Sequence, residues 1–315
     1  MATILITGGT GLIGQALTKA LLEKNYKVII LSRQPGMQEA ETGNLSFAQW
    51  DINSQQIDKA AIGSADYVIH LAGAGVADKR WTKKRKQEIV NSRVKSGEII
   101  VKALQEIQNN VKAVISASAI GWYGPDPVVP NPKPFREDDP YDKSFLGETC
   151  KVWEASLEPL KKLGKRLVKL RTGIVQSNDG GALKEFKSPL HFGVAAILGN
   201  GNQVISWIHI DDLVRLYISA IEDQNMNGVY NAVAPHPLSS KKLTLQLARI
   251  QRGNFFIPVH IPSFVLKMVI GEMSIEVLKS ATVSCDKIHY CGFVFLYPSA
   301  EAALKNLKEK MSNSR

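Results

Sequence analysis

A glycine-rich turn near the N-terminus constrains the fold of this chain more than any other feature. Residues 3–7 form a β-branched, apolar run typical of a buried strand, and the motif Gly-Gly-Thr-Gly-Leu-Ile-Gly follows at 8–14. From residue 12 onward, apolar residues recur at helical spacing. A strand that turns through glycines into a helix brings backbone N–H groups close to a pyrophosphate. The pattern therefore predicts a dinucleotide-binding site.

Each glycine of the motif has its own expected task. Gly8 permits the tight turn, Gly11 lets the backbone approach the phosphates, and Gly14 lets the helix pack on the strand. Glycines also punctuate ordinary turns, but their position between a strand and a helix favours nucleotide binding. The residues of this motif that are expected to contact the cofactor are Gly8, Thr10, Gly11, Leu12, Ile13 and Gly14.

The end of the second predicted strand indicates which dinucleotide binds. The strand at 27–31 ends in Ser32 and Arg33, where a chain that prefers NAD places an acid for the ribose 2′-hydroxyl. The first acid after this strand is Glu39. Because a guanidinium can bind a 2′-phosphate through two hydrogen bonds, Ser32 and Arg33 predict NADP(H). The alternative is that Arg33 is a solvated residue at a strand end.

Two further predicted strands complete the cofactor-binding half. The strand at 45–50 ends in Asp51 and Ile52, where the carboxylate can accept from the adenine amino group while Ile52 packs on the ring. The alternative for Asp51 is a turn residue. The strand at 67–71 ends in small residues, which let a cofactor pass close to the backbone. The contacts expected here are Leu71, Ala72 and Gly73.

Strands and helices alternate along the first part of the chain, with further strands at 111–118 and 166–171 and a helix at 93–108. This alternation predicts an α/β fold with a doubly wound parallel sheet, so residues 1–172 are expected to form a Rossmann domain. The proline-rich segment at 125–140 is expected to be a long loop.

Beyond residue 172, glycines break the chain into short pieces, with helices expected at 243–252 and 263–269. We expect residues 173–315 to form mainly a smaller, substrate-binding lobe, with about 201–233 returning to the Rossmann domain. Ligands in open α/β sheets lie at the carboxyl ends of the strands. The lobe is therefore expected to cover the nicotinamide end of the cofactor.

Composition excludes several other classes. The start of the chain runs directly into the first strand, so no leader peptide is expected. Three cysteines without metal-ligand spacing predict a reducing, cytoplasmic environment and no metal site. No membrane partner is expected, because the longest apolar stretch, 255–271, is interrupted by two prolines, a histidine and a lysine.

The net charge of +10 comes partly from basic clusters at 79–86 and 161–171. No aromatic stacking platform or DNA-binding motif accompanies them, so no nucleic-acid partner is expected. Attraction to an anionic cofactor and solvated helix faces explain these clusters better.

Several motifs together resemble the extended short-chain dehydrogenases/reductases. They are T-G-G-T-G-L-I-G at 7–14, D-I at 51–52, H-L-A-G at 70–73, S-A-S-A-I-G-W-Y-G at 116–124, R-T-G-I-V at 171–175, W-I-H-I-D-D-L at 207–213 and Y-N-A-V-A-P at 230–235. Further motifs, such as F-L-G-E-T-C-K-V-W-E at 145–154 and G-E-M at 271–273, resemble an atypical subgroup. This subgroup of NAD(P)-dependent epimerase/dehydratase-like proteins is often catalogued as cell-division-inhibitor-like epimerase family proteins. The resemblance extends from residue 3 to about 307.

The catalytic pair of that superfamily is absent from this chain. Its members transfer a proton through Tyr-x-x-x-Lys, and none of the eight tyrosines here has a lysine four residues later. Aligned on Glu154, the tyrosine position holds Leu146 and the lysine position holds Cys150. A helix asparagine common in such folds is replaced by Arg93, which is expected to contact the cofactor.

Part of the resembling site remains. Ser118 matches the active-site serine and is expected to polarise a carbonyl; the alternative is a hydroxyl that satisfies a strand-end backbone group. Tyr123 is a candidate substitute proton donor, with a structural role as the alternative. Arg80, Trp81 and Arg93 either line an anion pocket that faces the cofactor or are plain surface residues.

Two other residues are of types that often act in catalysis. His209, followed by Asp211 and Asp212, is expected to belong to a helix cap that ties the lobes together, with catalysis as the alternative. Cys150 is expected to be a small buried hydrophobe, with a reactive thiol as the alternative.

The resemblance implies an NADP(H)-dependent oxidoreductase or epimerase that acts on an unidentified small carbonyl or sugar-type molecule. The alternative is a catalytically silent NADP(H)-binding sensor or interaction protein, because the proton-transfer pair is missing. The oligomeric state is left open.

Overall fold

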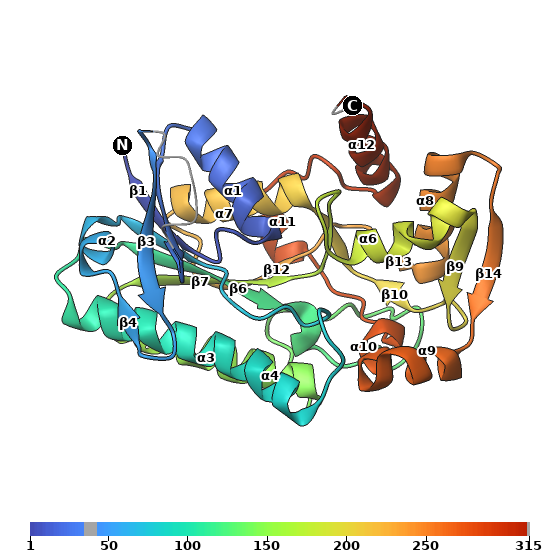
Figure 1. Cartoon of the computed structure of the whole chain (residues 1–315), viewed down its shortest axis with the longest axis horizontal. Helices are drawn as coiled ribbons and strands as arrows, with labels where there is room; N and C mark the ends of the chain where they lie inside the picture. The colour runs from blue at the N-terminus through green and yellow to red at the C-terminus, as the bar shows by residue number, and fades with distance from the viewer. Residues whose placement is uncertain (35–42, 314–315) are drawn as a thin grey trace.

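The computed structural model describes residues 1–34 and 43–313. Its centre is an eight-stranded sheet in the order β12-β7-β6-β5-β1-β2-β3-β4 (Figure 1). All neighbouring strands in it run parallel except β4, which is antiparallel to β3. The prediction of a doubly wound parallel sheet is confirmed. The strands are β1 (Thr3–Thr7), β2 (Lys27–Ser32), β3 (Leu45–Asp51), β4 (Gln56–Ile57), β5 (Tyr67–His70), β6 (Ala113–Ala119), β7 (Arg166–Thr172) and β12 (Gly228–Ala232).

Helices cover both faces of this sheet, as Figure 1 shows. One face packs on α1 (Leu12–Glu23) and α7 (Ile210–Glu222), and the other on α2 (Lys59–Ser64), α3 (Lys83–Glu106), α4 (Phe145–Ser156) and α5 (Pro159–Lys162). Side chains alternate along each strand, so Ile4 and Ile6 join one core while Leu5 joins the other. A short 3-10 turn, η2 (Ile120–Trp122), follows β6.

Helix α3 begins ten residues before the start predicted at residue 93. The Thr82 hydroxyl accepts a hydrogen bond from the Arg85 N–H at 3.1 Å and so caps the helix. The first turns are strongly basic and have no apolar periodicity, which is why the sequence pattern missed them. The Arg85 side chain is buried and bonded to Gly75, Asp78 and Glu88, which holds this basic turn in place.

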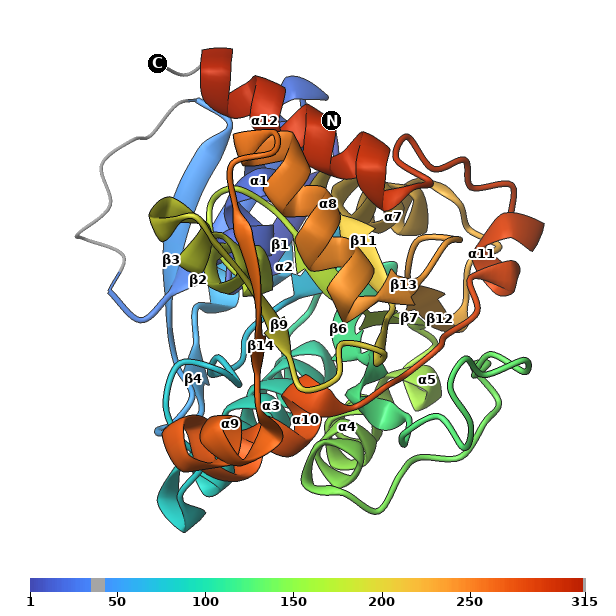
Figure 2. The same ribbon diagram turned by 90° about the vertical axis from the view of Figure 1, so that its right-hand side faces the viewer.

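The remaining segments, apart from α11, which packs against β12, build a C-terminal lobe at one end of the sheet (Figure 1), and this end faces the viewer in Figure 2. Its core is formed by apolar residues from α6, α8 and α12 and from the strands between them. The helices predicted at 243–252 and 263–269 are observed as α8 and α9. The elements are β8 (Ile174–Gln176), α6 (Ala182–Lys187), η3 (Pro189–Phe192), β9 (Val194–Leu198), β10 (Val204–Ile205), β11 (Trp207–His209), β13 (Leu238–Ser239), α8 (Ser240–Arg252), β14 (Ile257–Ile261), α9 (Ser263–Ile270), η4 (Gly271–Met273), α10 (Ser274–Leu278), α11 (Asp286–Tyr290) and α12 (Ala300–Asn313).

Between 173 and 315 the chain does not stay in the lobe. Strand β12 pairs in parallel with β7 at the edge of the main sheet, and α7 packs on α1. Among the residues that the structure describes, no helix combines the length and the apolar character needed to cross a membrane.

A buried histidine links three elements beneath the glycine-rich turn. The His70 ring lies on β5, with Nδ1 2.8 Å from Thr7 Oγ1 on β1 and Nε2 3.2 Å from Ser96 Oγ on α3. Burial, assisted by the nearby Arg93 charge, lowers the pKa of His70 to about 3. The ring is therefore neutral in the folded protein at any ordinary pH.

Acid is expected to destabilise the protein through this ring. The unfolded chain binds a proton at His70 near its ordinary pKa of 6.5, whereas the folded state resists protonation down to about 3. The stabilisation that comes from keeping His70 neutral is thus fully present above that ordinary pKa. It is lost as the pH falls, so that the free energy of unfolding is lower by about 3 kcal/mol near pH 4. Urea unfolding of the native protein and of His70→Asn between the ordinary pKa and about pH 4 measures this change in the free energy of unfolding. The pH dependence should be shallower in the variant, and equal slopes would contradict this role for His70.

Candidate functional site

The glycine-rich turn forms a backbone cradle in which Gly8 and Gly14 have no room for a Cβ. Gly8 has φ +72, and the Gly11 N–H donates to the Gly8 carbonyl at 3.0 Å. A Cβ on Gly14 would lie 2.5 Å from Gly9 Cα and still closer to the Gly8 carbonyl oxygen. A Cβ on Gly8 would lie 2.9 Å from the Leu71 carbonyl carbon. The spacing of the motif therefore reflects actual contacts between β1, α1 and the end of β5.

The start of α1 is open to an anion. Its N-cap is Gly11, no side chain caps it, and its first turn holds no acid. Thr10 and Gly11 are exposed, so the chain leading into the helix faces solvent, and the first N–H groups of a helix have no partner within it. Leu12 extends toward the segment after β8, since a Cβ on Gly181 would lie 3.3 Å from Leu12 Cδ2. Ile13 instead packs against the core below.

Neighbouring strand ends hold the other predicted cofactor contacts. The N–H groups of Leu71 and Ala72 both donate to Thr7 Oγ1 at 3.2 Å, which joins the ends of β1 and β5. At the end of β2, Ser32 is half-buried and Arg33 is exposed. Arg33 makes no hydrogen bond or ion pair with any residue in the described part of the chain. Glu39 lies outside the described residues.

Asp51 takes part in a turn at the end of β3. Its Oδ1 accepts from the Asn53 N–H and its Oδ2 accepts from the Ser54 hydroxyl, both at 2.8 Å, and these bonds lower the pKa of Asp51. The alternative role as a turn residue is thus observed. The side chain is also exposed, so its oxygens can accept a further bond. Ile52 is half-buried against the second core.

Arg93 lies against the small residues that follow β5. Its Nη1 donates to the Ala74 carbonyl at 2.9 Å and to the Ile89 carbonyl at 3.0 Å. A Cβ on Gly73 would lie 3.1 Å from Arg93 Cζ, and the guanidinium lies 5.0 Å from the Trp153 ring centre. Burial lowers the pKa of Arg93. The segment predicted to pass beside the cofactor is therefore lined by a fixed cation.

The three members of the expected anion pocket have different neighbours. Only Arg93 contacts Gly73. Trp81 is buried, its Nε1 donates to the Val76 carbonyl, and its ring packs edge-on against Phe145. Arg80 is exposed and approaches Gly271 of the lobe, where a Cβ would lie 2.6 Å from Arg80 Nε.

One face of α4 carries Leu146, Cys150 and Glu154 at intervals of four residues. A Cβ on Gly121 would lie 3.2 Å from Leu146 Cβ, and Cys150 Sγ lies 3.7 Å from the Ala119 carbonyl oxygen. Burial raises the pKa of Cys150 to about 12, so the thiol stays neutral and the expectation of a small buried hydrophobe is confirmed. Neither a leucine nor this thiol can exchange a proton with a substrate.

The third residue of this face, Glu154, engages Ser118. The buried Ser118 hydroxyl donates to Glu154 Oε1 at 2.7 Å. Ser118 is the residue before the last one of β6. Its hydroxyl is thus bonded to a buried carboxylate, and its role in polarising a carbonyl stays a prediction.

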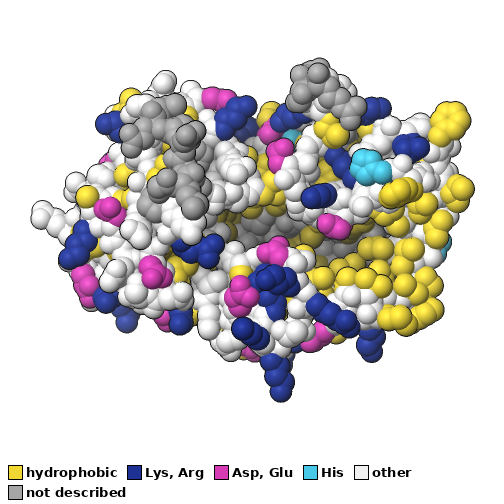
Figure 3. All heavy atoms as spheres, viewed as in Figure 1, with side chains coloured by type: hydrophobic (Ala, Val, Ile, Leu, Met, Phe, Trp, Pro, Cys, Tyr) yellow, Lys and Arg dark blue, Asp and Glu magenta, His cyan; other side chains and the backbone are white. Residues whose placement is uncertain are grey.

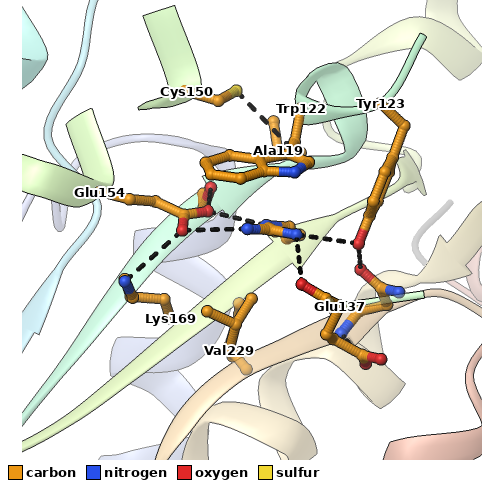
Figure 4. Close-up of polar contacts among 12 residues, drawn as sticks. Ala119, Trp122, Tyr123, Glu137, Cys150, Glu154, Lys169 and Val229 are labelled. Atoms are coloured by element: carbon orange, nitrogen blue, oxygen red, sulfur yellow. Dashed lines mark hydrogen bonds and ion pairs between the residues drawn. The ribbon is translucent and has the colours of Figure 1, made fainter. Parts of the chain in front are cut away.

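Tyr123 is also directed into the interior (Figure 4). Its hydroxyl donates to Asn231 Oδ1 at 2.6 Å and accepts from Arg171 Nη1 at 3.0 Å. The ring is fully buried, stacks on Phe135, and burial raises the pKa of Tyr123 to about 12. These bonds and this burial favour the alternative, a structural role, and the role of substitute proton donor stays a prediction.

Both hydroxyls belong to a buried ionic network that the sequence analysis missed (Figure 4). Arg171, at the end of β7, donates from Nε to Glu154 Oε1 at 2.8 Å and from Nη2 to Glu154 Oε2 at 3.2 Å. Its Nη1 also donates to the Glu137 carbonyl at 3.1 Å. The Trp122 ring covers the guanidinium, with Arg171 Cζ 3.6 Å from the ring centre. Lys169 Nζ lies 3.5 Å from Glu154 Oε2. The available signal was the presence of Lys169 and Arg171 at alternate positions of a strand that also begins with Arg166.

His209 has the architectural role expected for it. Its Nδ1 accepts from the Asp211 N–H at 3.1 Å, so the histidine itself caps α7, and burial lowers its pKa to about 4. The Asp212 carboxylate accepts from the N–H groups of Leu296 and Tyr297 at 2.8 and 2.9 Å. These bonds fasten α7 to the chain that leads into α12.

Comparisons with known proteins agree with the geometry. The model of the NAD dependent epimerase/dehydratase family matches residues 4–232, and that of a domain of unknown function matches 261–307. An epimerase family protein of Staphylococcus saprophyticus is 36% identical, covering 98% of this chain and 99% of the relative.

Two solved structures show similarity of fold and sequence. The human epimerase family protein SDR39U1 (isoform 2), solved with NADPH, has a TM-score of 0.85 at 28% identity over 98% of this chain and 99% of that one. A nucleoside-diphosphate sugar epimerase from Corynebacterium glutamicum has a TM-score of 0.75 at 30% identity over 96% of this chain and 57% of that one. With the family model spanning most of the chain, the resemblance predicted from the motifs is confirmed: this protein belongs to the NAD-dependent epimerase/dehydratase family.

Proposed function

We propose that this protein binds NADPH in the glycine cradle and acts as an oxidoreductase or epimerase on a small carbonyl or sugar-type molecule. The observation that carries the proposal is the closed turn in which Gly14 has no room for a Cβ, at the uncapped start of α1. That arrangement fits a pyrophosphate, which needs close backbone approach and free N–H donors. The human relative was solved with NADPH.

The other predicted residues complete the binding site in this proposal. Ser32 and Arg33 hold the 2′-phosphate, and Asp51 and Ile52 contact the adenine. The strand-end contacts toward the nicotinamide are Leu71, Ala72, Gly73 and Arg93. A buried cation beside Gly73 suits the phosphates or an anionic substrate group. Three unpaired cysteines suit a reducing compartment, and we place the protein in the cytoplasm.

Catalysis in this site proceeds without the Tyr–Lys pair. The bound cofactor supplies a hydride donor or acceptor. Leu146 and Cys150 present an apolar face to the end of β6, and Ser118 and Tyr123 are engaged in the interior. The proton therefore comes from the substrate or from water. Loss of a positioned acid typically costs 10²–10⁴-fold, so slow turnover is part of the proposal.

The same engagement of Ser118 and Tyr123 favours a second candidate, a catalytically silent NADPH-binding sensor. The two candidates differ in one measurement, NADPH oxidation against a broad panel of carbonyl compounds. Any substrate-dependent oxidation that saturates supports the enzyme. Tight NADPH binding with no turnover on the whole panel supports the sensor.

Arg33→Ala is expected to weaken NADPH binding roughly tenfold to a hundredfold and to leave NADH binding unchanged, because a charge-assisted bond to the 2′-phosphate is worth about 1.5–3 kcal/mol. Fluorescence titration of both reduced cofactors measures the effect. Arg252→Ala, which removes an exposed arginine at the end of α8, is the matched control. Equal losses for NADPH and NADH in the Arg33 variant would contradict the assignment.

A further inference from the structure

A large apolar surface lies on the outer side of the C-terminal lobe, over β14 and α9 (Figure 3). The exposed fractions of its large side chains run from 63% at Ile275 to 85% at Phe192. We call it the β14–α9 surface, and its members are Phe192, Phe255, Ile257, Phe264, Met268, Val269 and Ile275. We infer that a second copy of this chain binds here, so that the protein is a homodimer.

The lobe leaves these elements uncovered. No residue of α9 is buried, although seven of its eight side chains carry no charge. In β14 the first four residues are exposed, so neither face of that part of the strand is covered. Lys267 is the single Lys, Arg, Asp or Glu in the segment 255–270. Such a segment normally occupies a core or an interface.

The apolar side chains form one continuous surface. The Ile257 N–H donates to the Gly193 carbonyl at 2.8 Å, which places Phe192 beside the start of β14. Helix α9 begins just after β14 ends, and α10, which carries Ile275, packs against α9. Figure 2 shows β14 and α9 on the same side of the lobe, facing the viewer.

The area is sufficient for a stable dimer. A phenylalanine presents about 150–250 Å², so Phe192, Phe255 and Phe264 together expose on the order of 450 Å². The four aliphatic members contribute an area of the same order. The sum approaches the ~800 Å² per partner of a standard interface. A solitary apolar patch of this size is rare on a soluble monomer.

Composition favours a protein copy over a lipid surface. Interfacial helices that lie on membranes carry several basic residues along a polar face, whereas α9 carries only Lys267. Homodimer interfaces are instead apolar, depleted of charge and enriched in Phe and Met. The surface also spans a strand and two helices, which is a shape suited to an isologous contact about a two-fold axis.

The contact is made through side chains and not by pairing of β14 edges. Ile257 bonds to β9, so in a parallel ladder the alternate residues Pro258 and His260 direct their backbone groups outward. Pro258 has no N–H, which leaves His260 as the outward donor within the strand. Proline at this position is a known guard against strand addition.

The β14–α9 surface is connected to the proposed cofactor site by contacts between the residues after α9 and the segment that follows β5. Directly after α9, a Cβ on Gly271 would lie 2.6 Å from Arg80 Nε, and Lys86 Nζ lies 2.5 Å from Glu272 Oε1. Arg80 and Lys86 belong to the segment between β5 and the first turn of α3. A partner seated on α9 therefore holds the lobe against the loop that follows β5. The inference itself rests on the exposed surface and not on the proposed function.

The test is the oligomeric state of the full chain, measured by light scattering after gel filtration and by sedimentation velocity over about 1–100 µM. We expect a mass of twice 34.6 kDa for the native protein. Met268→Asp should raise the dimer dissociation constant roughly 100-fold or more, because a carboxylate would be buried at the interface.

Val294→Asp is the matched control, since Val294 is 70% exposed, as Met268 is 71%, but lies outside the β14–α9 surface. Circular dichroism confirms that both variants are folded. A dimer that dissociates only in the Met268 variant supports the inference. A native monomer throughout the range, a dimer that persists in Met268→Asp, or native monomers that sediment with vesicles of anionic phospholipid would overturn it.

Discussion

Gly14→Ala is expected to weaken NADPH binding at least 100-fold. The new Cβ would lie 2.5 Å from Gly9 Cα, a separation that side chains do not tolerate, and the three nearest atoms that it meets all belong to the backbone. The turn must therefore open, which displaces the N–H groups that the pyrophosphate requires. Titration of NADPH by fluorescence measures the loss, which corresponds to about 2.7 kcal/mol or more.

The matched control for this variant is Gly63→Ala in α2. A Cβ there meets only the Gln108 carbonyl oxygen at 3.5 Å, which is ordinary contact. Alanine also favours a helix over glycine. NADPH binding should stay at the native value in this control. An affinity of Gly14→Ala within about threefold of native would contradict the cradle, since that is under 1 kcal/mol.

Arg171→Met is expected to destabilise the protein by about 3–5 kcal/mol, because it leaves Glu154 buried without its main partner. The carboxylate would retain the Ser118 hydroxyl and, at 3.5 Å, Lys169. The variant also removes the cation that joins Tyr123, Glu137 and Trp122. Urea unfolding at neutral pH gives the free energy of unfolding directly.

An exposed ion pair provides the comparison for Arg171. Lys305 pairs with Glu301 at 2.7 Å on the surface of α12, and Lys305→Met should leave the free energy of unfolding close to the native value. A double variant, Glu154→Gln with Arg171→Met, removes both charges and should recover part of the loss. A loss below about 1 kcal/mol in Arg171→Met would contradict a network that holds α4, β7 and the loop at Glu137 together.

The parts of the fold that sequence could predict are those set by short-range patterns. Short apolar runs indicated the main strands, and the glycine spacing indicated the turn that Gly8 and Gly14 form. The start of α3 was missed because a cap at Thr82, and not apolar periodicity, determines it.

The candidate site shows which features local sequence patterns cannot predict. Ser118 and Tyr123 were proposed as catalytic because of their motif, but their partners lie 36 and 108 residues away along the chain, at Glu154 and Asn231. No spacing rule connects such pairs, since they are set by how β6, α4 and β12 pack. The cations Lys169 and Arg171 at alternate positions of β7 were the sequence feature that pointed to a polar network there.

Exposure is equally invisible to a sequence pattern. The apolar stretch at 255–271 was expected only to be too interrupted for a membrane span. In the structure Pro262 separates β14 from α9, whereas Pro258 lies within β14, and both elements remain largely uncovered. Hydrophobicity alone cannot distinguish a segment of the core from a segment of an interface. The difference depends on whether other segments of the chain pack against it.

The most direct test of this account is the affinity of the native protein for the two reduced cofactors under one buffer at physiological salt. Titration should show NADPH bound tenfold to a hundredfold more tightly than NADH, because Arg33 offers a guanidinium where an NAD-binding chain carries an acid. Equal affinities would contradict the assigned preference. Failure to bind either cofactor would contradict the site itself.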